Sequence, residues 1–318
     1  MRKWTICIII FFSFSAAAQN DSVTYVLQGR LTDFSHSNTT GRKWLIGGGT
    51  ALAYSGTMIA LNETWYKGFP RSSFHTFNDM GEWLQIDKLG HVLSTYQFSR
   101  GTTALWKWAG VPHKTSVWLG AGSGLLFMLS TEYMDGLSEE WGWSWPDAGA
   151  DLLGAAAFAV QELTWQEQRL QIKFSFHSIK YSDPQLDARS KDLYGSGLVQ
   201  GVLKDYNART NWYSLNVRSF FPQSKLPKWL NISFGYGAEG MFGGYENVSY
   251  DKNGNVVFDR RDIKRFRQWY FAPDVDFTKI KTNSRLVRSL FFALNSFKFP
   301  APSVEYSNGS FKLHAIGF

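Results

Sequence analysis

The sequence predicts an α+β protein, with an N-terminal four-helix bundle followed by an antiparallel β-sheet or partial barrel. Apolar and small residues at helical spacing dominate from about residue 42 to residue 164, whereas strict two-residue alternation dominates after about residue 166. A short apolar segment behind a basic start precedes both halves. We therefore expect a signal peptide at 1–19, a helical domain at 20–165 and an antiparallel β region at 166–318.

The N-terminal segment "MRKWTICIIIFFSFSAAAQN" has the three parts of a signal peptide: a basic start, a short apolar run and small residues near a cleavage site. The only cysteine, Cys7, lies inside it. The mature chain would then contain no disulfide, no thiolate metal site and no cysteine to carry a lipid. Export without cysteines favours a Gram-negative envelope protein over a disulfide-stabilised secreted domain.

Four helices are expected in the first half. An uncharged run at 44–62 approaches the length of a membrane span, although three consecutive glycines weaken it. A second helix is expected at 86–109. A third, at 114–138, carries Gly120 and Gly124 at the four-residue spacing that allows close helix approach. The fourth begins after Ser144, an N-cap residue, with Pro146 in its first turn. Short loops between these segments predict a bundle.

About six to eight strands are expected in the second half. Alternation of apolar and polar residues predicts strands within 169–177, 211–220 and 230–240. Asn253-Gly254 predicts the turn of a hairpin at 247–259. Strands are also expected at 267–277, where Pro273 favours an edge or a bulge, and at 309–318. The segment 284–297 predicts a short helix.

Charge and aromatic content suggest a membrane partner. The net charge is +7, the excess of base lies in the second half, and 17% of residues are aromatic. Such a surface suits membrane lipid or lipopolysaccharide. Export argues against nucleic acid. A terminal strand that ends on Phe318 favours the outer membrane, with the periplasm as the alternative. Protein partners are left open.

Ionisable residues recur in pairs on three of the expected helices. The members of each pair are three or four residues apart and so share a helical face. Charges in such small and apolar helices pair with one another or mark a site. The pairs, with the lysine that adjoins the first, are Asp87 and His91 with Lys88, Glu132 and Asp135, and Asp147 and Asp151.

The stretches "DKLGH" (87–91), "EYMDG" (132–136) and "SWPDAGADLLG" (144–154) resemble a pattern shared by VanZ-like membrane proteins and the YfiM-like family of predicted periplasmic lipoproteins. "FNDMGEW" at 77–83 is also similar, and the resemblance covers about residues 74–160. It implies a VanZ-like helical bundle and the seven candidate residues above, but no reaction. Asp151 stands where the VanZ-like pattern has asparagine.

The seven residues are candidates for acid–base catalysis, and four of them, His91, Glu132, Asp135 and Asp147, are candidate metal ligands. An oxygen-rich set with one imidazole suits Mg²⁺, Ca²⁺ or Mn²⁺ more than zinc. Three functions stay open: a scaffold with a buried polar network, an enzyme that acts on an envelope lipid or glycan, and a lipid or small-ligand binder. The sequence contains no serine-hydrolase elbow, phosphate loop, dinucleotide fingerprint or His-Glu-x-x-His motif.

Overall fold

The computed structural model describes residues 39–195 and 197–317, so the predicted signal peptide and Phe318 lie outside the described residues. The chain divides into two compact units that interleave along the sequence. Unit 1 contains the described residues up to Phe77, together with Ser94–Gln168 and Ile280–Leu294. Unit 2 contains Asn78–Leu93, Arg169–Lys279 and Asn295–Phe318. The division predicted at residue 165 stays a prediction.

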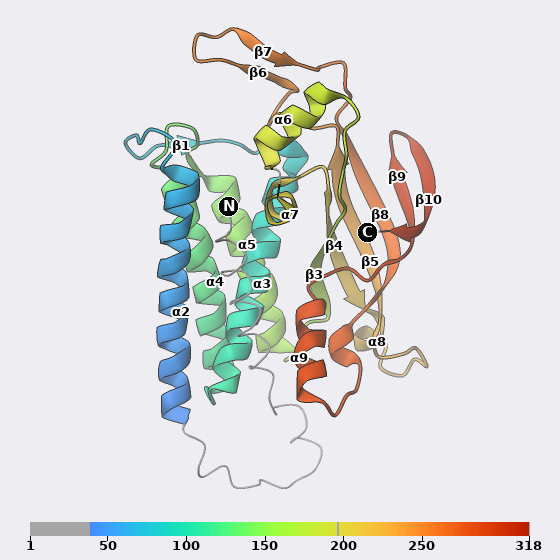
Figure 1. Ribbon diagram of the computed structural model, residues 1–318. Helices are drawn as coiled ribbons and strands as arrows, with labels where there is room; N and C mark the ends of the chain where they lie inside the picture. The colour runs from blue at the N-terminus through green and yellow to red at the C-terminus, as the bar shows by residue number, and fades with distance from the viewer. Residues whose placement is uncertain (1–38, 196, 318) are drawn as a thin grey trace, which may run out of the picture. The chain divides into compact units, whose positions relative to one another are not determined.

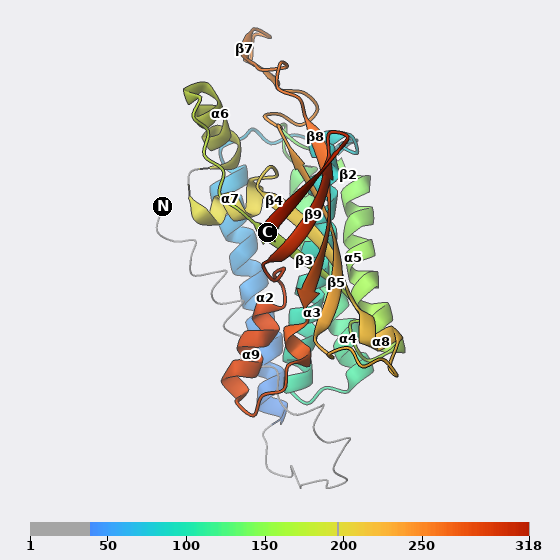
Figure 2. The same cartoon turned by 90° about the vertical axis from the view of Figure 1, so that its right-hand side faces the viewer.

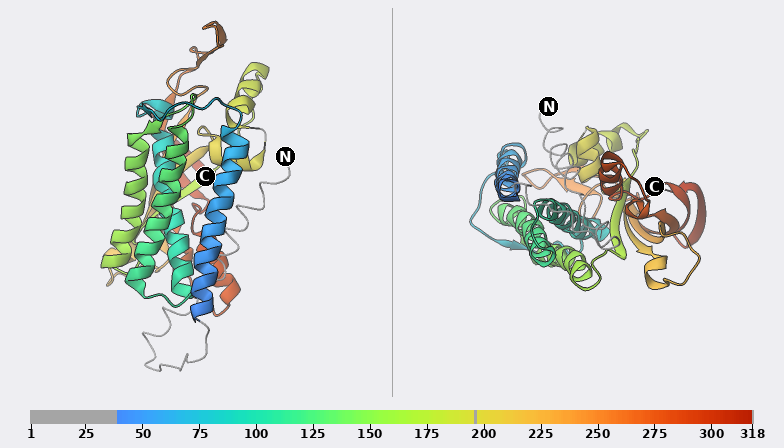
Figure 3. Two further views of the ribbon diagram at one scale, coloured as in Figure 1. Left: turned by 90° about the vertical axis from the view of Figure 1, so that its left-hand side faces the viewer. Right: turned by 90° about the horizontal axis from the view of Figure 1, so that it is seen from below.

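Unit 1 is helical (Figure 1, Figure 3). Its helices are α2 (Thr39–Leu61), the greater part of α3 (Ile86–Trp108), α4 (His113–Asp135), α5 (Trp145–Thr164) and α9 (Arg285–Leu294). A π-helical turn (Asn62–Tyr66) follows α2, and β1 (Thr76–Phe77) pairs in parallel with β2 (Trp143–Ser144). The four predicted helices are thus confirmed, as is the short helix α9. Their assignment as a VanZ-like bundle stays a prediction.

Glycines on α4 allow it to pack closely against α3. A Cβ added at Gly120 would lie 1.9 Å from Thr103 Oγ1, and one at Gly124 would lie 2.7 Å from Ser99 Oγ. The buried residues Ile46, Leu105 and Ala109 add an apolar contact between α2 and α3. Close helix approach, predicted from the spacing of the two glycines, is therefore what the structure shows.

Helix α2 differs from the other long helices because Ile46 is its one buried residue. Among the described residues it is the one helix whose length and composition suffice for a membrane crossing, and only 6% of its most apolar window is buried. Its exposed side chains include Trp44, Leu52 and Ile59. A helix in water normally buries its apolar stripe against other elements, and α2 leaves most of this stripe uncovered.

Unit 2 is built on a six-stranded antiparallel sheet, with the order β10-β9-β8-β5-β4-β3 (Figure 1, Figure 2). The strands are β3 (Leu170–Phe176), β4 (Arg209–Asn216), β5 (Leu230–Glu239), β8 (Phe266–Val275), β9 (Ala301–Ser307) and β10 (Ser310–Gly317). The antiparallel sheet is confirmed, whereas the alternative of a partial barrel is wrong for the described residues, since β10 and β3 stand at the two ends of an open order.

Unit 2 also contains smaller elements. They are a 3₁₀ turn (Glu82–Gln85), α6 (Pro184–Tyr194), α7 (Leu198–Lys204), α8 (Val217–Phe220), the β6 (Val248–Tyr250) and β7 (Val256–Asp259) pair, and a 3₁₀ turn (Phe277–Lys279). The predicted hairpin at 247–259 is confirmed: Gly254 has a φ of 80° in its turn. Helices α6 and α7 were not predicted.

Several strand predictions need correction. The strand expected at 211–220 ends at Asn216, because the Asn216 side chain accepts a hydrogen bond from Ser219 N and caps the short helix α8. Strand β9 was missed. Pro273 lies in β8, an interior strand and not an edge strand. Its missing N–H is tolerated because β9 pairs with β8 only from Gln268 to Phe271, which leaves Pro273 with a partner on the β5 side alone.

The two faces of the sheet have an unusual polarity. Polar side chains of alternate residues are buried, and Lys173, Ser214 and Asn231 are fully buried. Lys173 Nζ lies 2.8 Å from Asp274 Oδ2, and the Asn231 amide donates to Ser214 Oγ at 2.8 Å. Apolar side chains of the opposite face are exposed along β5, β8 and β10, among them Phe234, Phe271 and Leu313. A sheet in water normally has the reverse arrangement.

Candidate functional site

Helix α3 begins in a strained segment of unit 2. Trp83, Leu84 and Gln85 have φ values of 48°, 49° and 66°, a left-handed conformation that non-glycine residues rarely adopt. Hydrogen bonds hold it: Trp83 N donates to Gly244 O at 2.8 Å, and Tyr236 Oη donates to Leu84 O at 2.6 Å. Strained backbone of this kind concentrates at functional sites, and here it positions the first turn of α3.

The first turn of α3 carries Asp87 and Lys88 in a network of ion pairs. Lys88 Nζ lies 2.6 Å from Asp79 Oδ2 and 3.2 Å from Asp87 Oδ2. The Tyr206 hydroxyl donates to Asp87 Oδ1. Burial raises the pKa of Asp87, but the charges of His91 and Lys88 and the Tyr206 hydrogen bond outweigh it and lower that pKa. Asp87 is therefore a fixed carboxylate, and Lys88 is held between two acids.

One turn further on, in unit 1, Thr95 connects α3 to α5. Thr95 Oγ1 donates to Asp151 Oδ1 at 2.9 Å, and both residues are fully buried. The N-terminus of α5 is capped by Ser144, whose Oγ accepts from Asp147 N at 3.1 Å. Ser144 N in turn donates to Glu132 Oε2 at 3.3 Å, which links α4 to the same helix start.

The packing register brings the predicted pairs to the same level along these helices. Gly120 lies against Ser99 and Thr103, and Gly124 lies against Thr95 and Ser99. A step of one turn toward the C-terminus of α4 therefore corresponds to a step of one turn toward the N-terminus of α3. Two turns beyond Gly124, this register matches Glu132 with His91. Helix α3 is continuous through Leu93 and Ser94, so the position of His91 follows from that of Thr95.

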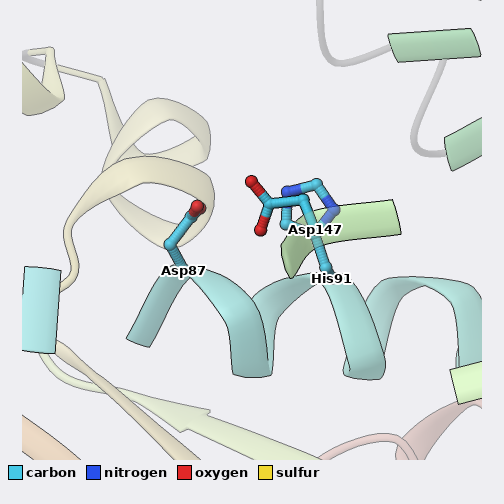
Figure 4. Close-up of side chains that lie close together, drawn as sticks. All are labelled: Asp87, His91 and Asp147. Atoms are coloured by element: carbon cyan, nitrogen blue, oxygen red, sulfur yellow. The ribbon is translucent and has the colours of Figure 1, made fainter. Parts of the chain in front are cut away.

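Two groups of ligand atoms share His91. The first consists of Asp87, His91 and Asp147, and the second of His91, Glu132 and Asp151 (Figure 4 shows the first). Within each group the ligand atoms lie within 4.8 Å of one another. Ligands around a six-coordinate Ca²⁺ at about 2.4 Å are separated by about 3.4 to 4.8 Å, so both groups have the dimensions of a cation site.

Burial distinguishes the carboxylates of this cluster from surface acids. Glu132, Asp147 and Asp151 are 2%, 3% and 0% exposed, and His91 and Asp87 are half-buried. Buried carboxylates this close together raise the energy of one another's charged forms unless a positive charge lies among them. By contrast, Glu139 and Glu140 are exposed.

Asp135 has a different environment from the other predicted ligands. Its Oδ1 accepts a hydrogen bond from the Tyr66 hydroxyl at 2.8 Å, and it belongs to neither group around His91. Burial, followed by the charge of Asp135, raises the pKa of Tyr66. The structure therefore brings together His91, Asp87, Glu132, Asp147 and Asp151, with Lys88 bonded to Asp87, and leaves Asp135 outside.

Two residues of this region were not predicted: Tyr206 and Arg209. Arg209 is the first residue of β4 and is 8% exposed. A Cβ added at Gly90 would lie 3.2 Å from Arg209 Nη1, so the guanidinium lies against α3 one residue before His91. A sequence signal did exist, because Arg209 occupies the face of the alternation that Tyr213 and Leu215 occupy. A charge at an apolar-face position is expensive and indicates a partner.

Comparison with known proteins finds a similarity to one family over part of the chain. A family model described as a predicted periplasmic lipoprotein (DUF2279) matches residues 75–163, which include all seven predicted site residues. The match supports a periplasmic protein and does not assign a reaction. No curated protein and no solved structure matches this chain significantly.

Proposed function

We propose that this protein is an exported envelope protein whose His91 cluster binds a divalent cation. The observation that carries the proposal is the pair of ligand groups that share His91, each within 4.8 Å. Four carboxylates, three of them buried, supply hard oxygen ligands around one imidazole. Such a set favours Mg²⁺, Mn²⁺ or Ca²⁺. A bound cation would also supply the positive charge that the buried acids need.

The chemistry that suits such a centre is hydrolysis or group transfer on an envelope lipid or glycan. A bound divalent cation would polarise an oxygen of the substrate and activate a water molecule. The chain's own residues would position the site: Tyr206 and Lys88 orient Asp87, Thr95 orients Asp151, and the Ser144 amide orients Glu132. Hydrogen bonds to ligating carboxylates are the usual support of metal sites.

Metal analysis of the purified full-length protein tests this proposal. We expect about one divalent cation per chain, lost on chelation and lost in Asp151→Asn. This variant keeps an oxygen acceptor for Thr95 and should fold. Glu140→Gln, at an exposed position in the connection between α4 and α5, is the matched control. A wild-type protein that takes up no Mg²⁺, Mn²⁺ or Ca²⁺ when these ions are supplied would refute the proposal.

A structural role for the cluster is the second candidate, and the hydrogen bonds that cross between helices favour it. Thr95–Asp151 and Ser144–Glu132 each join two helices, as a polar network that fixes helix register would. Under this alternative, Thr95→Val and Asp151→Asn lower stability and no metal is found. Under the cation proposal, Asp151→Asn loses metal but unfolds at nearly the wild-type denaturant concentration measured without metal.

We also propose that the protein is bound to a membrane, with the outer membrane as its address and a VanZ-like arrangement for its close-packed helices. Two surfaces support a lipid environment: the exposed apolar helix α2 and the exposed apolar face of β5, β8 and β10, whose strands bury polar residues on the other side. After alkaline extraction and density centrifugation, we expect the protein in the outer-membrane fraction. Recovery with the soluble periplasmic proteins would contradict this address.

A further inference from the structure

We propose that Arg209, which lies against helix α3 beside Gly90, binds a phosphate group of the ligand. The inference names the substrate class of the site and rests on the proposed function, because the phosphate would lie beside the His91 cluster. All the residues that carry the argument, Asp87, Gly90, His91, Tyr206 and Arg209, belong to unit 2.

The guanidinium of Arg209 is buried and has an N–H group without a hydrogen-bond partner in the described part of the chain. Arg209 is 92% buried, yet its Nε has no hydrogen-bond partner among the described residues. A guanidinium carries five N–H donors and no acceptor, and a buried donor without a partner costs free energy. Burial accordingly lowers the pKa of Arg209, although the charge of Asp87 opposes this effect.

The nearest acid does not serve as the partner of Arg209. Asp87 Oδ1 accepts a hydrogen bond from the Tyr206 hydroxyl, and Asp87 Oδ2 accepts one from Lys88 Nζ. The guanidinium lies over the ring of Phe174, with its Cζ 5.8 Å from the ring centre. Stacking of this kind uses the face of the guanidinium and leaves its N–H edges directed elsewhere. The N–H edges are the part of Arg209 that binds anions.

A glycine on α3 lies where the guanidinium meets the helix. Gly90 is the residue that allows Arg209 Nη1 to approach the helix, since even a methyl group there would meet it at 3.2 Å. Glycine in a helix interior costs about 1 kcal/mol relative to alanine, so its presence in α3 requires a reason. The close approach places the guanidinium against α3 at Gly90, one residue before His91, which both ligand groups share.

A phosphate group is the anion that suits both the guanidinium and the neighbouring cation. A guanidinium fork matches the oxygens of a phosphate in a bidentate manner, and a divalent cation beside it adds the second positive charge that phosphoryl groups require. A monocarboxylate has only two oxygens, whereas a phosphate group that fills the fork with two oxygens keeps another for the cation. Phosphate groups occur both free and on lipids or lipid-linked glycans, and the structure specifies the phosphate group that these sources share.

Binding of two probes to the full-length protein in detergent tests the inference: inorganic phosphate and the short-chain lipid dihexanoylphosphatidic acid, each titrated calorimetrically in the presence of Mg²⁺. We expect Arg209→Gln to weaken binding about 10- to 100-fold, and Arg209→Lys, which keeps the charge but not the fork, to weaken it less. Arg261→Gln removes an exposed arginine paired with Asp259 and is the control, with binding unchanged.

A second variant separates binding from folding. Gly90→Ala favours the helix by propensity but displaces the guanidinium, so we expect normal or raised stability together with weakened phosphate binding. Tighter binding of the lipid probe than of inorganic phosphate identifies a lipid source, and equal binding identifies the phosphate group alone; both support the inference. No binding of either probe, or wild-type affinity in Arg209→Gln, overturns it.

The metal content of the same samples tells the two proposals apart. Retained metal with no phosphate binding overturns the role of Arg209 and leaves the cation site intact. Absence of metal from the wild-type protein overturns the proposed function itself.

Discussion

Replacement of Gly120 by alanine would place a methyl group where helix α3 already lies. The added Cβ would come within 1.9 Å of Thr103 Oγ1 and within 2.7 Å of both Ser99 O and Thr103 N. The Thr103 side chain can rotate, but the two backbone atoms cannot. Ordinary contact begins at 3.4 Å, so α3 and α4 must separate by about 0.7 Å.

The cost of this separation sets the expected magnitude. Overpacking of a tight interface typically costs about 1 to 3 kcal/mol, and a Gly→Ala change in a helix returns up to about 1 kcal/mol through propensity. Gly122→Ala is the matched control, because the same helix carries it and no atom lies within 4 Å of the added Cβ. We therefore expect Gly122→Ala to be neutral or stabilising and Gly120→Ala to be less stable than it by about 1 to 3 kcal/mol.

The assay is denaturant unfolding of both variants in the same detergent, followed by circular dichroism. The separation of the helices would also move Glu132 away from His91, so bound metal should fall in Gly120→Ala and not in Gly122→Ala. Equal stability of the two variants would refute the packing register on which the site is built.

Three further predictions concern buried ionisable groups outside the cluster or at its edge. Burial raises the pKa of Asp205 to about 6 from 3.8. The stabilising contribution of the Asp205 carboxyl is therefore complete below pH 3.8 and is lost as the pH rises through 6. Denaturant unfolding at pH 8 should show Asp205→Asn to be more stable than the wild-type protein by about 1 to 3 kcal/mol. Burial lowers the pKa of Lys298 to about 8 from 10.5, so the stability of the folded protein should rise between pH 8 and pH 10.5. In thermal melts, Lys298→Met should flatten this rise. An unchanged dependence of the melting temperature on pH in this variant would contradict the lowered pKa of Lys298. The pKa of Asp87 is lowered below 3.8, so the stability that the Asp87 carboxylate contributes is present above pH 3.8 and is lost on acidification. Tyr206→Phe removes a hydrogen bond to this carboxylate and should lower the free energy of unfolding by about 1 to 2 kcal/mol at pH 7 and progressively less at lower pH. An equal decrease in acid would count against the lowered pKa.

The periodicity of the chain was sufficient to predict most elements. The four long helices, the helix at α9 and the strands β3, β5, β8 and β10 follow from local spacing. Strand β9 was missed although Asn308-Gly309 follows it: both residues have positive φ, 49° and 78°, the conformation of a two-residue hairpin turn. The local signal for this strand is weak because "PAPSVEYS" (300–307) contains two prolines and a glutamate.

Face assignment was the harder part of the fold. Alternation identifies a strand, but it does not say which face is buried. In β3, Lys173 lies on the buried face, where Asp274 and Val275 O accept from it, and the ionic partner comes from a strand about a hundred residues later. Such long-range pairing has no local signature in the sequence.

The candidate site, like the fold, could be predicted from the sequence only in part. The pairs Asp87–His91 and Asp147–Asp151 were predictable because helical spacing fixes which residues share a face. Asp135 shares a face with Glu132 in the same way, yet Tyr66 engages it away from His91. The role of Arg209 depends on the approach of a strand to Gly90, and only the three-dimensional structure shows it.

The central claim is that His91 and the buried carboxylates surround one cation. Pulsed electron paramagnetic resonance of the Mn²⁺-loaded protein tests it most directly, because the nitrogen of a coordinated imidazole modulates the signal of the bound ion. We expect modulation from a single histidine nitrogen in the wild-type protein and none in His91→Gln. A nitrogen signal that persists in His91→Gln, or Mn²⁺ bound with oxygen ligands alone, would contradict the account.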